Sequence, residues 1–193
     1  MTSNVHPLRK PAALLKLRIE LEGVRPLVWR VVQVPESIPL DRLHQVFQIA
    51  MGWEDSHLHE FIIGKDRYRI PDPDFDEPGT MIAEKGVPLA KALGSGKRFQ
   101  YSYDFGDGWE HTVTVEDRGV AADLSTNARC LAGENACPPE DVGGPPGYAE
   151  FLRVIANPRH KRRKAMLEWC GGGFDAGAFD LGGVNRKLKR LRM

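Results

Sequence analysis

No stretch of this 193-residue chain approaches the roughly 20 consecutive apolar residues that cross a bilayer, so no membrane-spanning helix is expected. Cysteine is scarce: Cys130, Cys137 and Cys170 are an odd number in a chain without a secretory pattern, which argues against a disulfide framework. The first twenty residues have no long apolar segment after their basic residues, unlike a secretory signal. We therefore expect a cytoplasmic protein without a membrane partner.

Several short catalytic motifs are absent as well. The sequence contains no P-loop, no G-x-G-x-x-G and no G-x-S-x-G, which removes the usual phosphate-binding loops and the serine-hydrolase elbow. His160 and Arg163 have the spacing seen in tyrosine recombinases, but the last tyrosine of the chain, Tyr148, precedes them. Because the attacking residue is missing, that class of recombinase is excluded.

The formal net charge is only +1, yet it is divided unevenly along the chain. Residues 151–193 carry eleven Lys and Arg against three acidic residues, a net charge of +8, which leaves −7 on the remainder. Such asymmetry can mark a nucleic-acid-binding end, and the alternative is solvated helix faces that pair with the acidic body. The candidate nucleic-acid contacts are Lys161, Arg162, Arg163, Lys164, Arg186, Lys187, Lys189 and Arg190.

Hydropathy patterns predict two strands and a helix at the start of the chain. Residues 14–21 alternate between apolar and charged side chains, which is typical of a half-buried strand, and residues 27–34 form a second apolar segment. From Leu40 to Met51 the apolar period becomes helical, and Gly52 follows where a C-terminal cap belongs. The opening is similar to a β-grasp, at the level of fold analogy.

The rest of the chain continues this mixture. Strands are predicted over 57–63, 99–105 and 109–116, a short helix or connector over 87–98, and loops over 70–80 and most of 117–147. Three helices are predicted over 147–158, 161–173 and 179–191, the last with Asp180 as its N-cap. This order predicts an α+β fold with a mixed sheet, in which a second hairpin and C-terminal helices follow the opening hairpin and helix. We expect residues 1–13 to be a flexible N-terminus and 14–193 a single domain that is mainly helical from about residue 148.

The segment "YDFGDGWEHTV", which begins at Tyr103, reads as the tip of the second hairpin. A three-residue loop, Gly106-Asp107-Gly108, places Phe105 opposite Trp109 and Tyr103 opposite His111. This register is favoured because it gives both strands one shared aromatic face.

In the same register Asp104 lies directly opposite Glu110. Like charges in that position destabilise a strand pair, so an arginine, a metal ion, a proton or water should offset them. The alternative is a structural one, in which Asp104 caps the turn and His111 is a core histidine.

A histidine pair strengthens the case for a metal. His57 and His59 form a His-x-His on one face of the predicted third strand, a spacing that can chelate an ion. If this strand lies near the hairpin, both converge with His111 and with Asp104 or Asp107, and a divalent metal such as zinc is the expected cofactor. The alternative is two strand histidines at a polar rim.

Four ordered stretches resemble the plasmid pRiA4b open-reading-frame-three family from about Leu14 to Leu191: "VWRVVQVPESIPLDRLHQVFQIAMGWEDSHLHEF", "YDFGDGWEHTV", "RCLAGENACPPEDVGGPPGYAEFL" and "GGFDAGAFDLGGVNRKL". The resemblance implies an α+β domain and supplies no catalytic residues. The positions that match the family motifs are Trp53, Glu54, His57, His59, Asp104, Asp107, Trp109, Glu110, His111, Cys130, Cys137, Pro138, Glu140 and Asp141.

Two cysteines and two acidic residues of that set have other interpretations. The spacing of Cys130 and Cys137 lacks the short C-x₂₋₄-C knuckle of structural zinc sites. Glu140 and Asp141 could be further ligands or could stabilise the start of the following helix.

Some members of the family carry the label TnpR resolvase. A serine resolvase needs a nucleophilic serine near the start of its catalytic domain, and Ser3 lies in the predicted flexible terminus. The sequence therefore speaks against resolvase chemistry.

Two functions follow from these patterns. The preferred one is a cytoplasmic binding or interaction module of plasmid or mobile-element origin, with nucleic acid or a protein as its partner. The alternative is a metal-dependent hydrolase or nuclease with a carboxylate as general base. The candidate site residues are Trp53, Glu54, His57, His59, Asp104, Asp107, Trp109, Glu110 and His111.

Overall fold

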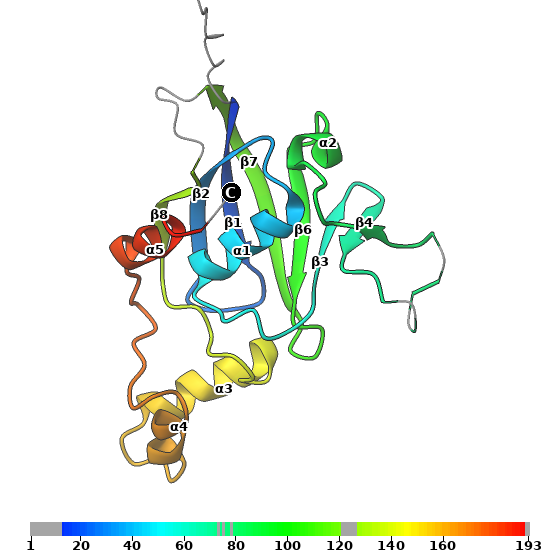
Figure 1. Cartoon of the computed structure of the whole chain (residues 1–193). Helices are drawn as coiled ribbons and strands as arrows, with labels where there is room; N and C mark the ends of the chain where they lie inside the picture. The colour runs from blue at the N-terminus through cyan, green and yellow to red at the C-terminus, as the bar shows by residue number, and fades with distance from the viewer. Residues whose placement is uncertain (1–12, 73, 75, 78, 121–126, 192–193) are drawn as a thin grey trace, which may run out of the picture.

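The computed structural model describes residues 13–72, 74, 76–77, 79–120 and 127–191 (Figure 1). The predicted flexible N-terminus lies outside these residues, apart from Ala13, which begins the first strand. In chain order the elements are β1 (Ala13–Leu21), β2 (Trp29–Pro35), α1 (Leu40–Met51), β3 (His59–Ile63), β4 (Asp66–Arg69), β5 (Ile82–Ala83), α2 (Leu89–Leu93), β6 (Arg98–Tyr103), β7 (Trp109–Val120), β8 (Arg129–Glu134), α3 (Gly144–Ala156), α4 (Arg163–Trp169) and α5 (Leu181–Leu188).

The strands form one mixed sheet in the order β5-β4-β3-β6-β7-β1-β2-β8. Neighbouring strands are antiparallel except β4 and β5, which are parallel. Helix α1 lies across one face of the sheet, α5 lies beside β8, and α3 and α4 extend from the end that carries the β6–β7 loop (Figure 1). This arrangement confirms the predicted α+β class. No helix in the described part of the chain is long and apolar enough to cross a membrane.

The main core lies between the sheet and α1. The apolar face of β1, from Leu15 to Leu21, is buried, and so is the α1 stripe that runs from Leu40 to Met51. Gly52 ends α1 in the left-handed region at φ 99°, as its position predicts, and its N–H donates to the Gln48 carbonyl. On the opposite face of β1 the side chains are polar, for example Lys16, which pairs with Glu116 at 3.0 Å.

Arg30 of β2 connects four parts of this core and is almost fully buried. Its guanidinium donates to the carbonyls of Trp29, Ala50, Glu134 and Asn135 at 2.7–2.9 Å. The Cζ atom lies 4.0 Å from the centre of the Phe179 ring. Arg30 therefore ties β2, the end of α1, the end of β8 and the segment before α5 together.

The region 117–147 contains more structure than the sequence predicts. Strand β7 continues to Val120, and residues 129–134 form β8, in a region that the sequence predicts to be mostly loop. The intervening residues 121–126 lie outside the described part. The hydropathy pattern of β8 is weak because it is an edge strand in which only one of six residues is buried. Asn185 of α5 covers this edge, donating to the Cys130 carbonyl at 2.8 Å and accepting from the Cys130 N–H at 2.9 Å.

The predicted register of the second hairpin is wrong by two residues. Tyr103 pairs with Trp109 and Tyr101 with His111, so the connection spans five residues instead of three. The loop is longer because Asp104 adopts the left-handed conformation at φ 53° and turns the chain away from the strand direction. Phe105 therefore lies in the loop, with 46% of its surface exposed.

The like-charge pair predicted from that register is absent. Ser102 lies opposite Glu110 and donates to its carboxylate at 2.6 Å. The shared aromatic face survives the shift, because a displacement of two residues keeps every side chain on its own side of the sheet.

Candidate metal centre and the adjoining cavity

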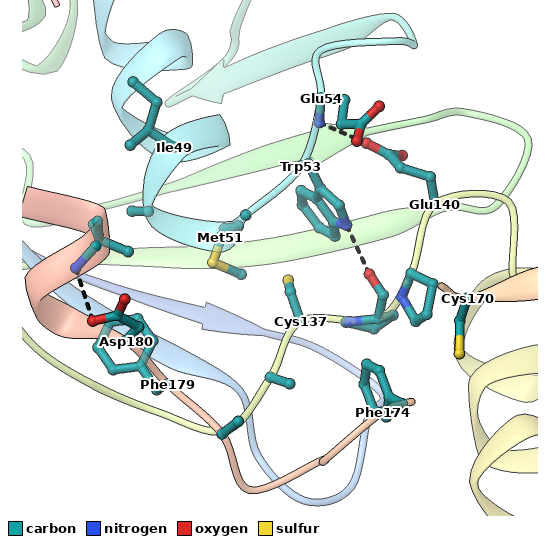
Figure 2. Close-up of a pocket in the computed structure, with 18 of the residues that line it drawn as sticks. Ile49, Met51, Trp53, Glu54, Cys137, Glu140, Cys170, Phe174, Phe179 and Asp180 are labelled. Carbon is teal, nitrogen blue, oxygen red and sulfur yellow. Dashed lines mark hydrogen bonds between the residues drawn. The ribbon is translucent and has the colours of Figure 1, made fainter. Parts of the chain in front are cut away.

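The segment between α1 and β3 supplies most of the candidate site. Trp53 packs on Tyr103 with ring centroids 4.9 Å apart and donates from Nε1 to the Pro138 carbonyl at 3.0 Å (Figure 2). The N–H of Glu54 donates to Glu140 at 2.9 Å (Figure 2). These bonds hold the acidic 138–141 turn against the end of α1.

Three carboxylates surround the Nε2 atom of His57. The nearest oxygens belong to Asp141 at 3.2 Å, Asp104 at 3.6 Å and Glu140 at 3.7 Å. The Nε2 atom and Glu140 Oε2 are both buried, and neither has a hydrogen-bond partner within the described residues. This set is called the His57 cluster below.

Two of these carboxylates are held so that one oxygen remains directed at His57. Asp104 Oδ1 accepts the N–H groups of Gly106 and Asp107 at 3.0 and 3.2 Å, and Oδ2 faces the histidine. Glu140 Oε1 accepts from the Glu54 N–H and from the Tyr103 hydroxyl at 3.1 Å. Anchoring of one oxygen while the other points inward is what outer-shell hydrogen bonds do for metal-ligating carboxylates.

The hairpin loop also holds the turn that carries Asp141. Asp107 Oδ2 accepts the Gly143 N–H at 3.0 Å. At Gly144 a Cβ atom would come within 2.3 Å of the Asp107 carbonyl oxygen, so this position requires glycine for the two loops to meet. Asp104 and Asp141, distant in sequence, are adjacent for this reason.

The geometry of the His57 cluster fits a divalent cation. Bonds of about 2.1 Å in tetrahedral coordination place the ligand atoms roughly 3.4 Å apart, close to the observed separations from Nε2. Ligand atoms of His57, Asp104 and Asp141 all lie within 4.8 Å of one another. A set of one imidazole with several carboxylates suits zinc or manganese better than softer metals.

A second cluster lies deeper, beneath α1. The imidazoles of His44 and His59 stack in parallel with centroids 3.4 Å apart. Each has its own carboxylate: His44 Nε2 lies 2.7 Å from Asp55, and His59 Nε2 lies 2.8 Å from Glu84.

Burial and the neighbouring His59 lower the pKa of His44 to about 4, although Asp55 opposes this shift. A neutral His44 donates from Nε2 to Asp55 and accepts at Nδ1 from the Tyr101 hydroxyl at 2.8 Å. Tyr101 in turn accepts from Gln48 at 3.0 Å. His44, Asp55, Tyr101 and Gln48 each have a protein hydrogen-bond partner in this network, which orders the segment around Asp55.

Two hollows flank the His57 cluster. A cavity of about 620 Å³ is lined by His57, His59, Asp55 and Glu84 together with Arg69. A groove of about 640 Å³ lies on the other side, where Figure 2 shows Met51, Cys137, Phe174 and Phe179 around it. Glu140 and Asp141 line this groove, so the cluster is reached from both hollows.

The structure divides the four residues predicted as metal ligands. His57 and Asp104 come together, but His59 belongs to the stacked pair with His44, because β3 begins at His59 and His57 precedes it. His111 joins neither group. It is fully buried, and its Nδ1 lies 3.0 Å from the Tyr101 carbonyl.

The other predicted site residues have structural positions. Trp53 and Trp109 are buried with ring centroids 6.1 Å apart, and Glu110 bonds to Ser102 on the other face of the sheet. Asp107 shapes the loop, and Glu54 contributes its N–H.

Two members of these clusters, Asp55 and Glu84, are missing from the site predicted from sequence, which leaves the role of Asp141 open. Asp55 stands beside the histidines in "GWEDSHLH", and Asp141 was weighed as a ligand or a helix-stabilising residue. Glu84 is a lone acid in "MIAEKG", and nothing in its neighbourhood predicts that it meets His59.

His111 should make stability fall in mild acid. Burial lowers its pKa from 6.5 to about 4, so below pH 6.5 the unfolded chain binds a proton that the folded chain refuses. Replacing His111 by Leu should therefore reduce the slope of unfolding free energy against pH near pH 5 by up to about 1.4 kcal/mol per pH unit. Urea unfolding at several pH values measures this. Val113→Ala, in the same core, should lower the curve without changing its slope; equal slopes in His111→Leu and the wild type would contradict the assignment.

The basic residues near the C-terminus are divided between α4 and α5, which lie apart in Figure 1. Several are paired: Arg162 with Glu150, Lys164 with Glu168, and Arg186 with Asp180. Arg163 donates to the Ile155 carbonyl. Lys161, Lys187, Lys189 and Arg190 are exposed and form no ion pair within the described residues.

Fold and site together define an α+β domain with a mixed sheet and a histidine–carboxylate cluster at one end. Residues 13–182 match the family described as plasmid pRiA4b ORF-3-like protein, and the chain belongs to this family. It is 41% identical over 182 residues to the uncharacterized protein y4hQ of Sinorhizobium fredii (strain NBRC 101917 / NGR234), covering 93% of each chain. The crystal structure of MM3350 from Methanosarcina mazei Go1, a protein of unknown function, superposes with a TM-score of 0.79 at 32% identity, covering 89% of this chain and 97% of that one.

Proposed function

We propose that the protein is a hydrolase that binds one divalent cation at the His57 cluster. The observation that carries the proposal is the buried, unpartnered Nε2 atom of His57, faced by three carboxylate oxygens at 3.2–3.7 Å. Buried polar atoms in native proteins normally have partners, so a shared cation accounts for both His57 and Glu140.

The chain would contribute to hydrolysis in two ways. His57, Asp104 and Asp141, whose ligand atoms all lie within 4.8 Å of one another, would hold the cation, with Glu140 Oε2 as a further oxygen 3.7 Å from His57 Nε2. Such a cation would lower the pKa of a bound water toward neutrality. Asp141 has a side chain that is 71% exposed, so its second carboxylate oxygen would be available as the general base. The cavity beside His57 has the size of a small-molecule or side-chain pocket.

Metal binding by the purified full chain tests the proposal. After removal of metal with EDTA, calorimetric titration with Zn²⁺ or Mn²⁺ should give about one site per chain. His57→Ala should weaken that binding at least about 100-fold, because it removes a direct ligand rather than an outer-shell partner.

Two controls make this experiment decisive. Glu110→Gln changes a carboxylate of the same hairpin on the opposite face and should leave affinity unchanged. His59→Ala distinguishes the observed cluster from the set predicted from sequence and should also retain the site. A wild-type stoichiometry near zero would contradict the metal centre. A bound metal without hydrolysis of any phosphate ester, carboxylate ester or peptide would contradict the hydrolase.

A second candidate function is association with nucleic acid. It is supported by the exposed, unpaired Lys161, Lys187, Lys189 and Arg190 in the charged C-terminal part. Changing all four to Gln should weaken binding to a labelled oligonucleotide more than tenfold and flatten its dependence on salt, since fewer counterions are released. The matched control replaces Lys65, Lys85, Lys91 and Lys97. If both sets of substitutions weaken oligonucleotide binding equally, the binding is non-specific electrostatic attraction and not a site at these four residues.

We further propose a cytoplasmic location and an origin on a plasmid or mobile element. All three thiols are free, which suits a reducing compartment. Burial raises the pKa of Cys137 to about 12, so this thiol is not a nucleophile. The plasmid origin is supported by the family description.

A further inference from the structure

Exposed apolar side chains gather around the mouth of the 620 Å³ cavity. Leu58 and Ile70, 57% and 64% exposed, line the cavity directly. Phe105, 46% exposed, has its ring 5.7 Å from the guanidinium carbon of Arg69, which also lines the cavity. These three residues and Ile82 of β5, 40% exposed, are called the apolar rim.

The rim is concentrated rather than scattered. Of the seven large apolar residues that are exposed in the described part of the chain, four belong to it. Single exposed apolar residues need no explanation, but a group around a cavity marks a binding surface. A groove that binds a partner through apolar contacts is therefore the best account of this mouth.

The open edge of the sheet adjoins the rim. Strand β5 is the last strand in the sheet order, and within the described residues no strand pairs with its outer side. Ile82 pairs with Tyr68 of β4, so the edge continues the surface that Ile70 begins. This edge is two residues long, Ile82–Ala83, so an extended polypeptide can form main-chain hydrogen bonds along that short stretch and place alternate side chains against the rim.

The charge around the mouth favours a cationic partner. Asp41 lines the cavity, Asp55 and Glu84 line it as partners of His44 and His59, with Glu84 buried, and Asp104 and Asp141 meet it at His57. The cations that line it are Arg42, which lies near Asp41, and Arg69, which pairs with Asp76. A polyanion such as nucleic acid, or an anionic membrane, would be repelled here.

We infer that the apolar rim and the edge of β5 bind an extended polypeptide segment in which apolar residues alternate with lysine or arginine. As a statement about the substrate, this inference rests on the hydrolytic role proposed for the His57 cluster. As a statement about binding, it stands on the rim, the open edge and the acidic mouth.

Fluorescence anisotropy with a labelled ten-residue peptide of alternating valine and lysine tests the binding. The wild-type chain should bind this peptide more tightly than one of alternating valine and glutamate. The variant in which Lys161, Lys187, Lys189 and Arg190 are changed to Gln should still bind the peptide, and more tightly than it binds an oligonucleotide. Leu58→Ser combined with Ile70→Ser should weaken binding at least tenfold. Because both side chains are exposed, the fold is retained, and the matched control Leu27→Ser, at a residue outside the rim, should have no effect.

The same assay separates this inference from the metal centre. His57→Ala should abolish metal binding but leave peptide affinity within about twofold, while the rim variant should retain the metal. Peptide binding that is unchanged in the rim variant would overturn the inference. The inference would also be overturned if the peptide does not bind and the rim variant instead abolishes binding to vesicles of anionic phospholipid, or abolishes dimerisation of the chain.

Discussion

Replacing Arg30 by Ala should destabilise the protein by about 4 kcal/mol or more, which is enough to unfold many domains of this size. The guanidinium satisfies four carbonyls, in β2, at the end of α1 and at two consecutive residues at the end of β8, and each buried carbonyl left without a donor costs about 1–3 kcal/mol. Burial lowers the pKa of Arg30, and no carboxylate among the described residues forms an ion pair with it. Its role is therefore to supply donors in a fixed plane. Urea unfolding followed by circular dichroism measures the loss.

Arg30→Lys is the informative companion to this experiment. Lysine retains the charge but offers three donors from one atom, so it cannot reach four carbonyls in the fork geometry of arginine. We expect most of the stability loss to persist. Arg42→Ala, on the outer face of α1, should cost less than 0.5 kcal/mol. A loss below 1 kcal/mol in Arg30→Ala would show that water replaces the guanidinium without penalty.

Asp141→Asn should be at least as stable as the wild type without metal, and less stable than the wild type when Zn²⁺ is bound. In EDTA the variant should be at least as stable as the wild type, because one of three neighbouring negative charges is gone. With Zn²⁺ at a thousand times its dissociation constant, the wild type should gain about 4 kcal/mol, or roughly 10 °C in melting temperature. The variant should gain much less. Asparagine tolerates the left-handed backbone that Asp141 adopts at φ 56°, so the substitution adds little strain.

Thermal unfolding in EDTA and in Zn²⁺ reads out both halves of this prediction. Glu110→Gln should respond to Zn²⁺ like the wild type. An identical Zn²⁺ response in Asp141→Asn would mean that the ion, if bound, does not use this carboxylate. A loss of stability in EDTA would mean that Asp141 stabilises the turn rather than the cation.

Much of the fold was predictable because periodicity reports burial. The β1 and α1 patterns gave correct elements, and Gly52 and Asp180 marked helix ends correctly; Asp180 accepts the Gly183 N–H at 2.8 Å. The hairpin register was not predictable by the same rule. Shifts of two residues preserve the faces of a strand, so hydropathy cannot separate a loop of three residues from a loop of five.

The candidate site was predictable only in part, for a related reason. His57 and His59 look equivalent in sequence, but His57 lies outside β3 and turns toward the hairpin loop. The partners that decide their roles, Glu84 and Asp141, come from distant segments. Asp141 reaches His57 because Gly144 approaches Asp107 closely, and Glu84 reaches His59 because of the order of the strands. Local sequence patterns predict neither contact.

The segment from Gly52 to Glu60 has a further consequence for engineering the protein. Every second residue of this segment contacts a different partner, and these residues are Trp53, Asp55, His57 and His59. The length of the segment therefore determines which residue meets which partner. Removing or adding one residue would exchange the partners of all four at once, whereas a single substitution affects one. A designer who transplants the centre into another scaffold would need to move this nine-residue piece at its full length, with the two turns that meet it.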